Sequence, residues 1–270
     1  MGRRGTHRKK PLLDLLTIRF PDYSRDDLFR RTMCSEVRVD GGIERDPRRP
    51  VAVDAEIELV ARRFVSRGGD KLYAALEAWR IAVADRVWLD AGASTGGFTD
   101  CLLQSGAATV HAVDVGYNQL AYDLRRDRRV VVHERTNILD LDSLRPRPAS
   151  AVCDLSFRSL RGVLRHILEL TVEGWGIALL KPQFELAAEA RWNREGTHDA
   201  LAGGGGVVLG DSRGAVIGRV IEELSEIDGI RVLRSLDSPV RGRHGNREVL
   251  LLVGLVDQLR KSEGRNGSPM

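Results

Sequence analysis

Two lysines differ from the other basic residues of this chain, which are nearly all arginines. Only five of the 42 basic residues are lysines, and Lys9, Lys10 and Lys261 lie near the ends of the chain. The two interior lysines are Lys71 and Lys181. A lysine can lose its proton when it is desolvated or crowded by another cation, whereas an arginine effectively cannot. These two amines are therefore candidates for proton transfer, with chance placement as the alternative.

A glycine-rich turn is the second feature that could do chemistry. The segment 90–97, DAGASTGG, begins where a predicted strand ends, and Asp114 ends the next strand, 24 residues after Asp90. A carboxylate at that place can bind both hydroxyls of a ribose. The spacing is not G-x-G-x-x-G, which favours S-adenosylmethionine, a cofactor without a pyrophosphate, over a nicotinamide dinucleotide. The candidate cofactor-binding residues of this region are Asp90, Gly92, Ser94, Thr95, Gly96, Gly97 and Asp114.

Further candidates follow from the same region. Gly92 is expected to let the backbone turn sharply, and Gly96 and Gly97 to let a ligand and the following helix come close. Asn137 and Asp140, just after the third strand, are candidate partners for an adenine amino group. Ordinary turn chemistry explains these last two residues equally well.

The elements that position these residues alternate from residue 70 onward. Apolar residues at Leu72, Ala75, Leu76 and Trp79 predict an amphipathic helix. Strands are predicted at 86–90, 109–116, 129–134, 149–154, 175–181, 230–236 and 248–256, with helices between most of them. This order predicts an α/β fold, a Rossmann-like doubly wound, mostly parallel seven-stranded sheet with an antiparallel edge. Ligands bind such sheets beyond the carboxyl ends of the strands.

Residues 11–60 predict a separate, small α+β unit. Ser24 is expected to cap a helix that turns Leu28, Phe29 and Met33 toward a core, and a strand over 36–39 enters a hairpin. The segment YSRDDLFRR…EVRVDGGIERDPRRPV resembles the alpha-L RNA-binding motif of a ribosomal small-subunit protein and of pseudouridine synthases. The resemblance implies that four arginines bind RNA phosphates, with solvated surface residues as the alternative. These are Arg25, Arg30, Arg31 and Arg38.

The distribution of charge also favours an anionic partner. Residues 1–50 carry 13 basic and 8 acidic side chains, whereas the other 220 residues carry 29 and 30. The net charge of +4 therefore arises entirely in the first fifth of the chain. A basic module joined to a neutral one is typical of proteins that bind nucleic acid, and a solvated tail is the alternative.

Composition excludes several classes of protein. The three cysteines are far apart and form no C-x-x-C, which argues against a disulfide scaffold and a structural zinc site and fits a reducing cytoplasm. The longest apolar stretch, 250–256, is too short to cross a bilayer, and no apolar segment follows the first basic residues as in a signal peptide. We therefore expect a cytoplasmic protein with neither a metal nor a membrane partner; a monomer is assumed.

Five long segments of the second module carry a closer resemblance. They are FVSRGGDKLYAAL, WLDAGASTGGFTDCLLQSGAATVHAVDVGYNQL, CDLSFRSL, LLKPQFE and SPVRGRHGNREVLLL, which together cover most of residues 60–256. The module resembles the TlyA branch of the FtsJ-like RNA methyltransferases, whose members are often labelled hemolysins. The resemblance implies S-adenosylmethionine-dependent methylation of a ribose 2′-hydroxyl in ribosomal RNA, on free RNA or a ribosomal subunit.

The resemblance also implies a catalytic set. FtsJ-like enzymes use a Lys-Asp-Lys-Glu constellation, which falls here on Lys71, Asp154, Lys181 and Glu248. A free lysine, with a pKa of about 10.4, is almost fully protonated at neutral pH. Placing two lysines together disfavours charging both, so we expect Lys181 to face the hydroxyl as a neutral amine, oriented by the carboxylates. The alternatives are that Asp154 caps a helix and that Glu248 pairs with Arg247 or a neighbouring strand.

The expected layout has five parts and leaves rival functions open. It comprises a basic tail at 1–10, an RNA-binding domain at 11–60, a linker at 61–69, a methyltransferase domain at 70–257 and a tail at 258–270. The segment 185–211, with four glycines at 203–206, is either a lid or an unremarkable insertion. The rival functions are a catalytically silent RNA-binding or ribosome-assembly protein, a membrane-acting cytolysin and a small-molecule methyltransferase.

Overall fold

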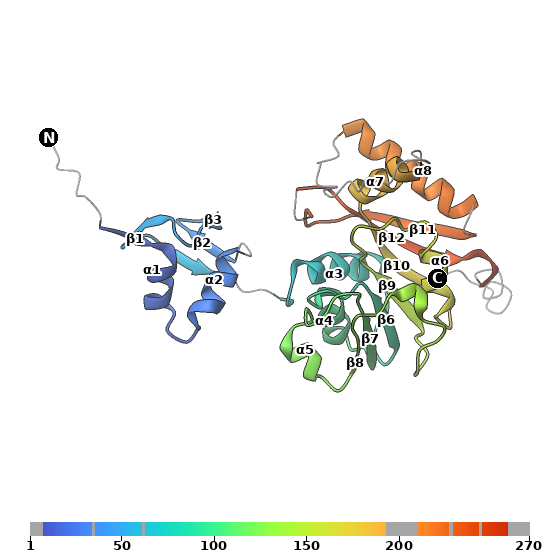
Figure 1. The fold of residues 1–270 in the computed structure, drawn as a ribbon, viewed down its shortest axis with the longest axis horizontal. Coiled ribbons are helices and arrows are strands. Elements are labelled where there is room, and N and C mark those ends of the chain that lie inside the picture. The colour runs from blue at the N-terminus through green and yellow to red at the C-terminus, as the bar shows by residue number, and fades with distance from the viewer. Residues whose placement is uncertain are drawn as a thin grey trace. The chain divides into compact units, whose positions relative to one another are not determined.

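The computed structural model describes residues 8–33, 36–60, 63–192, 210–226, 229–242 and 245–258. The chain divides into two compact units, residues 1–63 and 64–270, which are treated separately below (Figure 1). Within the described residues, no helix has the length and apolar character needed to cross a membrane. The glycine run at 203–206 lies outside the described residues.

The first unit is a small α+β fold with its own core. Its elements are β1 (Lys9–Pro11), α1 (Leu12–Arg19), α2 (Arg25–Met33), β2 (Val37–Val39), β3 (Gly42–Glu44), β4 (Pro50–Ala52) and β5 (Ile57–Leu59). β2 lies between β3 and β5 in a three-stranded antiparallel sheet, and β1 pairs with β4. Leu12, Leu16 and Leu28 are fully buried between the helices and the strands.

Two local features predicted for the first unit, a helix N-cap and a hairpin turn, are present. The backbone N–H of Asp27 donates to Ser24 Oγ at 3.1 Å, and that hydroxyl donates to Asp27 Oδ2 at 2.7 Å, which confirms the N-cap of α2. Asp40 and Gly41 have φ of 49° and 78°, as a two-residue hairpin turn requires.

Two expectations for the first unit are wrong. Phe29 and Met33 are 44% and 55% exposed, because α2 buries only the narrow face that carries Leu28 and Thr32. The segment 1–10 was expected to be a basic tail, but its last two residues are folded. Lys9 and Lys10 belong to strand β1, which pairs with β4.

The second unit is built on one mixed sheet. Its elements are α3 (Arg67–Trp79), β6 (Val87–Ala91), α4 (Gly97–Gln104), β7 (Thr109–Val113), α5 (Tyr122–Arg126), β8 (Val130–His133), the 3₁₀ helix η1 (Ile138–Asp140), β9 (Ser150–Cys153), α6 (Leu164–Glu169), β10 (Trp175–Leu180), α7 (Pro182–Trp192), α8 (Gly210–Glu226), β11 (Ile230–Asp237) and β12 (Val249–Leu255). The strand order is β11-β12-β10-β9-β6-β7-β8 (Figure 1). β10 through β8 in this order run parallel, while β12 is antiparallel to both β10 and β11. The predicted fold class is confirmed.

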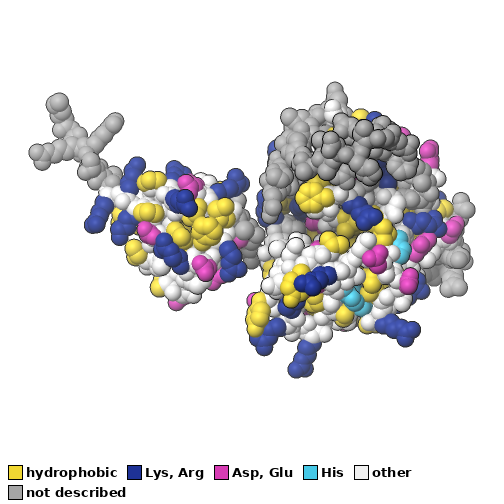
Figure 2. Space-filling model, viewed as in Figure 1, with side chains coloured by type: hydrophobic (Ala, Val, Ile, Leu, Met, Phe, Trp, Pro, Cys, Tyr) yellow, Lys and Arg dark blue, Asp and Glu magenta, His cyan; other side chains and the backbone are white. Residues whose placement is uncertain are grey.

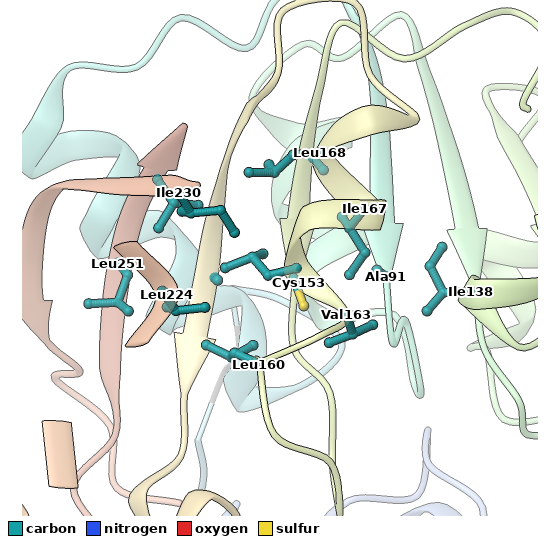
Figure 3. Close-up of a cluster of buried hydrophobic side chains, with 14 of the residues drawn as sticks. Ala91, Ile138, Cys153, Leu160, Val163, Ile167, Leu168, Leu224, Ile230 and Leu251 are labelled. Carbon is teal, nitrogen blue, oxygen red and sulfur yellow. The ribbon is translucent and has the colours of Figure 1, made fainter. Parts of the chain in front are cut away.

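Alternate residues of the strands face two separate cores. Leu89 and Cys153 lie in a cluster with residues of α6 and α8, whereas Trp88 and Val152 lie in a cluster with residues of α3 and α4. Figure 3 shows part of the first cluster, with Ile167 and Leu224 beside the strands. This division follows from the two-residue period of a strand and explains why the strands read as continuous apolar runs.

The boundary between the units differs from the expected linker. Phe64 is 3% exposed within the second unit, and α3 already begins at Arg67. The segment expected at 61–69 as a linker is therefore partly folded into the second unit.

Candidate active site at the carboxyl ends of the strands

Strand pairing brings three of the four candidate catalytic residues to one edge of the sheet. Asp154 follows β9 and Lys181 follows β10, and these strands run parallel with Cys153 beside Ala178. Glu248 directly precedes β12, whose Val249 pairs with Leu180 of β10. Because β12 runs antiparallel to β10, its first residues lie where β10 ends.

The four side chains form two ion pairs. Lys71 Nζ lies 2.5 Å from Glu248 Oε2, and Lys181 Nζ lies 2.7 Å from Asp154 Oδ1. Lys71 and Lys181 are only 8% and 9% exposed. Each buried ammonium thus has a carboxylate partner of its own, which offsets the desolvation that would otherwise disfavour it. The pairing also neutralises the charge of Lys71. Electrostatic repulsion between the two lysines is therefore weaker than between two unpaired ammonium groups.

Lys181 makes two further contacts that sequence reasoning missed. Its Nζ donates to Ser156 Oγ at 3.0 Å and lies 5.5 Å from the centre of the Phe184 ring. Ser156 is exposed, two residues beyond Asp154 on the loop that follows β9. The only feature of the sequence that could have indicated this contact is a hydroxyl residue, Ser156, close to the carboxylate of Asp154 at the end of the strand.

Close helix packing positions Lys71. Ser66 caps α3 by accepting from the backbone N–H of Gly68 at 3.3 Å. A Cβ at Gly97 on α4 would lie 2.1 Å from Ser66 Oγ and 2.9 Å from Gly69 N. Glycine at this crossing therefore lets α3 approach α4 closely, and the next turn of α3 carries Lys71.

The glycine-rich turn serves internal packing as much as ligand approach. Gly92 has a φ of 86°, and a Cβ there would lie 2.7 Å from the carbonyl oxygen of Asp154. Gly96 has a φ of 95°, and its Cβ would lie 2.3 Å from Leu124 Cδ1. The predicted sharp turn at Gly92 is present. The close approach at Gly96 and Gly97, however, is between protein segments, and a ligand is expected instead over the exposed residues Ser94 and Thr95.

Two aspartates flank this turn in different environments. Asp114 accepts from the N–H groups of Ser94 at 2.8 Å and Gly116 at 2.6 Å, which fixes a partly exposed carboxylate. Asp90 is fully buried, and Thr99 Oγ1 donates to its Oδ2 at 2.6 Å. Burial, reinforced by the charge of Asp154, raises the pKa of Asp90 to about 7 despite that hydrogen bond.

These residues fit the expected cofactor. Among the described atoms, Asp90 Oδ1 is buried without a hydrogen-bond partner, so it is available to a positively charged amino group. The fixed carboxylate of Asp114 retains acceptor capacity for ribose hydroxyls. One carboxylate that can accept from an ammonium and one that can accept from ribose hydroxyls match the amino-acid end and the ribose of S-adenosylmethionine.

Comparison with known proteins identifies the family of the chain. The model of the FtsJ-like methyltransferase family matches residues 64–255 of the chain. The chain belongs to this family. The candidate rRNA methyltransferase YqxC of Bacillus subtilis is 41% identical over 207 residues, which cover 74% of this chain and 70% of YqxC.

Two further relatives extend the similarity. The 16S/23S rRNA (cytidine-2′-O)-methyltransferase TlyA of Mycobacterium tuberculosis is 48% identical over 159 residues, covering 57% of this chain and 59% of TlyA. A solved structure of a candidate hemolysin from Streptococcus thermophilus is 30% identical with a TM-score of 0.62, covering 97% of this chain and 99% of that one. Similarity to this solved structure therefore extends over both units.

Asn137 and Asp140 are held within their own turn. The Asn137 side chain accepts from the N–H of Leu139 at 3.3 Å as the N-cap of η1, and its amide nitrogen lies 3.5 Å from Asp140 Oδ1. The turn explanation accounts for both residues, and a contact with adenine stays a prediction.

The candidate phosphate-binding arginines lie on the surface of the first unit. Figure 2 shows Lys and Arg side chains around a group of hydrophobic side chains on its visible face. Three of the four arginines form ion pairs: Arg25 with Asp14 at 2.8 Å, Arg30 with Asp27, and Arg31 with Glu36 at 3.2 Å. Arg38 is exposed on β2, opposite Ile43 and Glu58. The pairs of Arg25 and Arg30 are exposed, and exposed ion pairs are weak and can exchange a carboxylate for a phosphate.

Proposed function

We propose that this FtsJ-like protein transfers a methyl group from S-adenosylmethionine to the 2′-hydroxyl of a ribose in ribosomal RNA, in the cytoplasm. The observation that carries the proposal is the set of two lysines and two carboxylates beside the glycine-rich turn, in which Lys71, Lys181 and Glu248 are buried. A relative that is 48% identical is named for the same reaction on 16S and 23S rRNA.

The chain's own residues supply binding and proton transfer. When bound, S-adenosylmethionine supplies a methyl group that its sulfonium makes electrophilic. Asp114 would hold the cofactor ribose and Asp90 its amino group, so that the two ends of the cofactor are fixed. The weak nucleophile is the ribose hydroxyl, and the protein must align it and accept its proton.

Lys181 is assigned as the acceptor of that proton. A protonated lysine has three N–H donors; Lys181 donates one of them to Ser156 Oγ and forms an ion pair with Asp154. When the nitrogen is uncharged, one N–H group can stay on Ser156 Oγ, and the lone pair then points away from that oxygen. Lys181 Nζ would accept the proton of the ribose hydroxyl when that oxygen takes the methyl group.

The first unit is the proposed RNA-binding module. It holds the basic surplus of the chain, and Arg25, Arg30, Arg31 and Arg38 lie on its surface. Phosphate contacts fix register and orientation on RNA without reading sequence. The target nucleotide would then be selected by the second unit and by the shape of the RNA around it.

The test is methyl transfer mapped to single nucleotides. Purified full-length protein would be incubated with labelled S-adenosylmethionine and with free ribosomal RNA, small subunits or large subunits. We expect label on specific ribose 2′-oxygens, detected by resistance to alkaline cleavage, and none with the Lys181→Ala variant. Cofactor and RNA binding without transfer would favour the silent RNA-binding alternative, and label on a base would assign a different reaction.

A further inference from the structure

A buried carboxylate lies one helical turn beyond Lys181. Glu185 on α7 is 1% exposed, although nothing in the proposed reaction uses it. Its Oε1 accepts from the N–H of Leu160 at 2.9 Å, and its Oε2 accepts from Ser159 Oγ at 2.5 Å. Arg161 lies 3.4 Å from Oε2. Burial raises the pKa of Glu185, and these donors oppose that shift.

Glu185 therefore joins α7 to the loop that follows β9. This loop runs from Asp154 to Arg161 and is held at both ends. At one end the N–H of Asp154 donates to the carbonyl of Ala91 at 3.0 Å, and at the other Glu185 holds the backbone of Leu160. Ser156 lies between these two anchors.

The middle of the loop has an unusual backbone conformation. Phe157 has a φ of 61°, a region that aromatic residues rarely adopt, and its ring lies 5.0 Å from that of Phe184 on α7. Such a conformation persists only when the surrounding structure determines it. The anchors at Asp154 and Glu185 hold the loop in this conformation, and they thereby restrict the position of Ser156 as well.

We propose that Ser156, held in place by Glu185, is a positioning residue for Lys181. The ion pair with Asp154 alone leaves the amine free to rotate about one contact. The hydrogen bond to Ser156 Oγ at 3.0 Å adds a defined N–H direction and thereby restricts the direction of the lone pair. The catalytic consequence rests on the proposed function, whereas the effect on the Lys181 amine does not.

The first measurement follows the amine itself. The chain has only two interior lysines, so the ¹⁵N signals of lysine side chains form a simple spectrum, and Lys181→Arg assigns one of them. We expect Ser156→Ala and Glu185→Gln to move the Lys181 signal in the same direction and to leave the Lys71 signal unchanged. The matched controls are Ser225→Ala and Glu222→Gln, at exposed positions of α8. An unchanged Lys181 signal in Ser156→Ala would overturn the proposal.

The second measurement is turnover on ribosomal RNA. We expect Ser156→Ala to lower kcat about 10- to 100-fold, the size of a misplacement effect, with the KM for RNA and the Kd for S-adenosylmethionine changed less than about twofold. Ser156→Thr, which keeps the hydroxyl, should recover most of the loss. Glu185→Gln should lower kcat in the wild-type background but add little to Ser156→Ala, because it acts through that hydroxyl.

The outcomes separate the two proposals. A wild-type protein without transfer to any ribosomal RNA, combined with the expected movement of the Lys181 signal, would refute the proposed function and keep the positioning role. Normal kcat in Ser156→Ala, or full additivity of the two substitutions, would refute the positioning role and keep the proposed function. Melting temperatures of all variants distinguish either result from loss of folding.

Discussion

Lys71 and Glu248 are 177 positions apart in the chain, yet Lys71 Nζ and Glu248 Oε2 form a buried ion pair of 2.5 Å. The pair links α3 to the start of β12, so it connects the helix beside the glycine-rich turn with the strand next to Lys181. A Cβ at Gly242 would lie 2.5 Å from Glu248 Oε1, so the loop that precedes β12 packs closely against this carboxylate.

Breaking this pair should cost stability as well as activity. We expect Lys71→Met and Glu248→Gln each to lower the free energy of unfolding by about 3 kcal/mol, because each leaves a buried partner uncompensated. The double variant should be more stable than the sum of the two losses predicts. Urea unfolding of the four proteins measures the coupling, and strict additivity would show that the two groups do not interact.

Removing Lys181 should separate chemistry from binding. We expect Lys181→Ala to lower kcat by about 10²- to 10⁴-fold, the usual contribution of a positioned proton acceptor, while calorimetry detects nearly unchanged binding of S-adenosylmethionine. Lys181→Arg should lower kcat by a similar factor, because a guanidinium keeps its proton. Near-normal turnover in either variant would remove Lys181 from the reaction.

The buried carboxyl of Asp90 should make stability depend on pH. Its pKa rises from 3.8 to about 7 in the folded chain, so between these values the folded state binds more protons than the unfolded state. Stability contributed by this group therefore falls as pH rises from about 4 through 7, by about 4 kcal/mol in total.

The matching variant is Asp90→Asn. We expect it to gain stability relative to the wild type at pH 8 but not at pH 4, and to bind S-adenosylmethionine more weakly at both. Unfolding curves at the two pH values provide the measurement. A difference between the proteins that does not change with pH would contradict the raised pKa.

The arginines of the first unit should act on RNA affinity rather than on chemistry. We expect Arg38→Ala to weaken binding of ribosomal RNA and to lower the slope of log K against log salt by about one, as loss of one phosphate contact does. The kcat at saturating RNA should stay constant. Glu58→Gln, which changes the acidic residue opposite Arg38, serves as the control on the same sheet. An unchanged salt slope would assign Arg38 to the solvated surface.

Sequence reasoning identified the strands because their physical signal is local. Apolar runs buried on both faces mark β6, β7, β9 and β10, and the polar residues that end them necessarily meet at one edge of a parallel sheet. The Lys-Asp-Lys-Glu set came from the family resemblance, which also rests on short segments of the sequence. Neither inference requires knowledge of long-range contacts.

The partners within the site required the three-dimensional structure. Which carboxylate pairs with which lysine depends on β12 lying beside β10, a contact between distant segments. Ser156 and Glu185 went unnoticed because their roles depend on the path of one loop. Phe29 and Met33 were misplaced for a related reason, since helical periodicity marks an apolar face but not how much of it another element covers.

The position of β12 has a consequence for how the protein is made. This strand comes last among the described elements, yet it lies inside the sheet, between β10 and β11. A growing polypeptide that ends before residue 248 lacks both an interior strand and the acidic partner of Lys71. The candidate active site is therefore complete only once this strand has been synthesised and has joined the sheet.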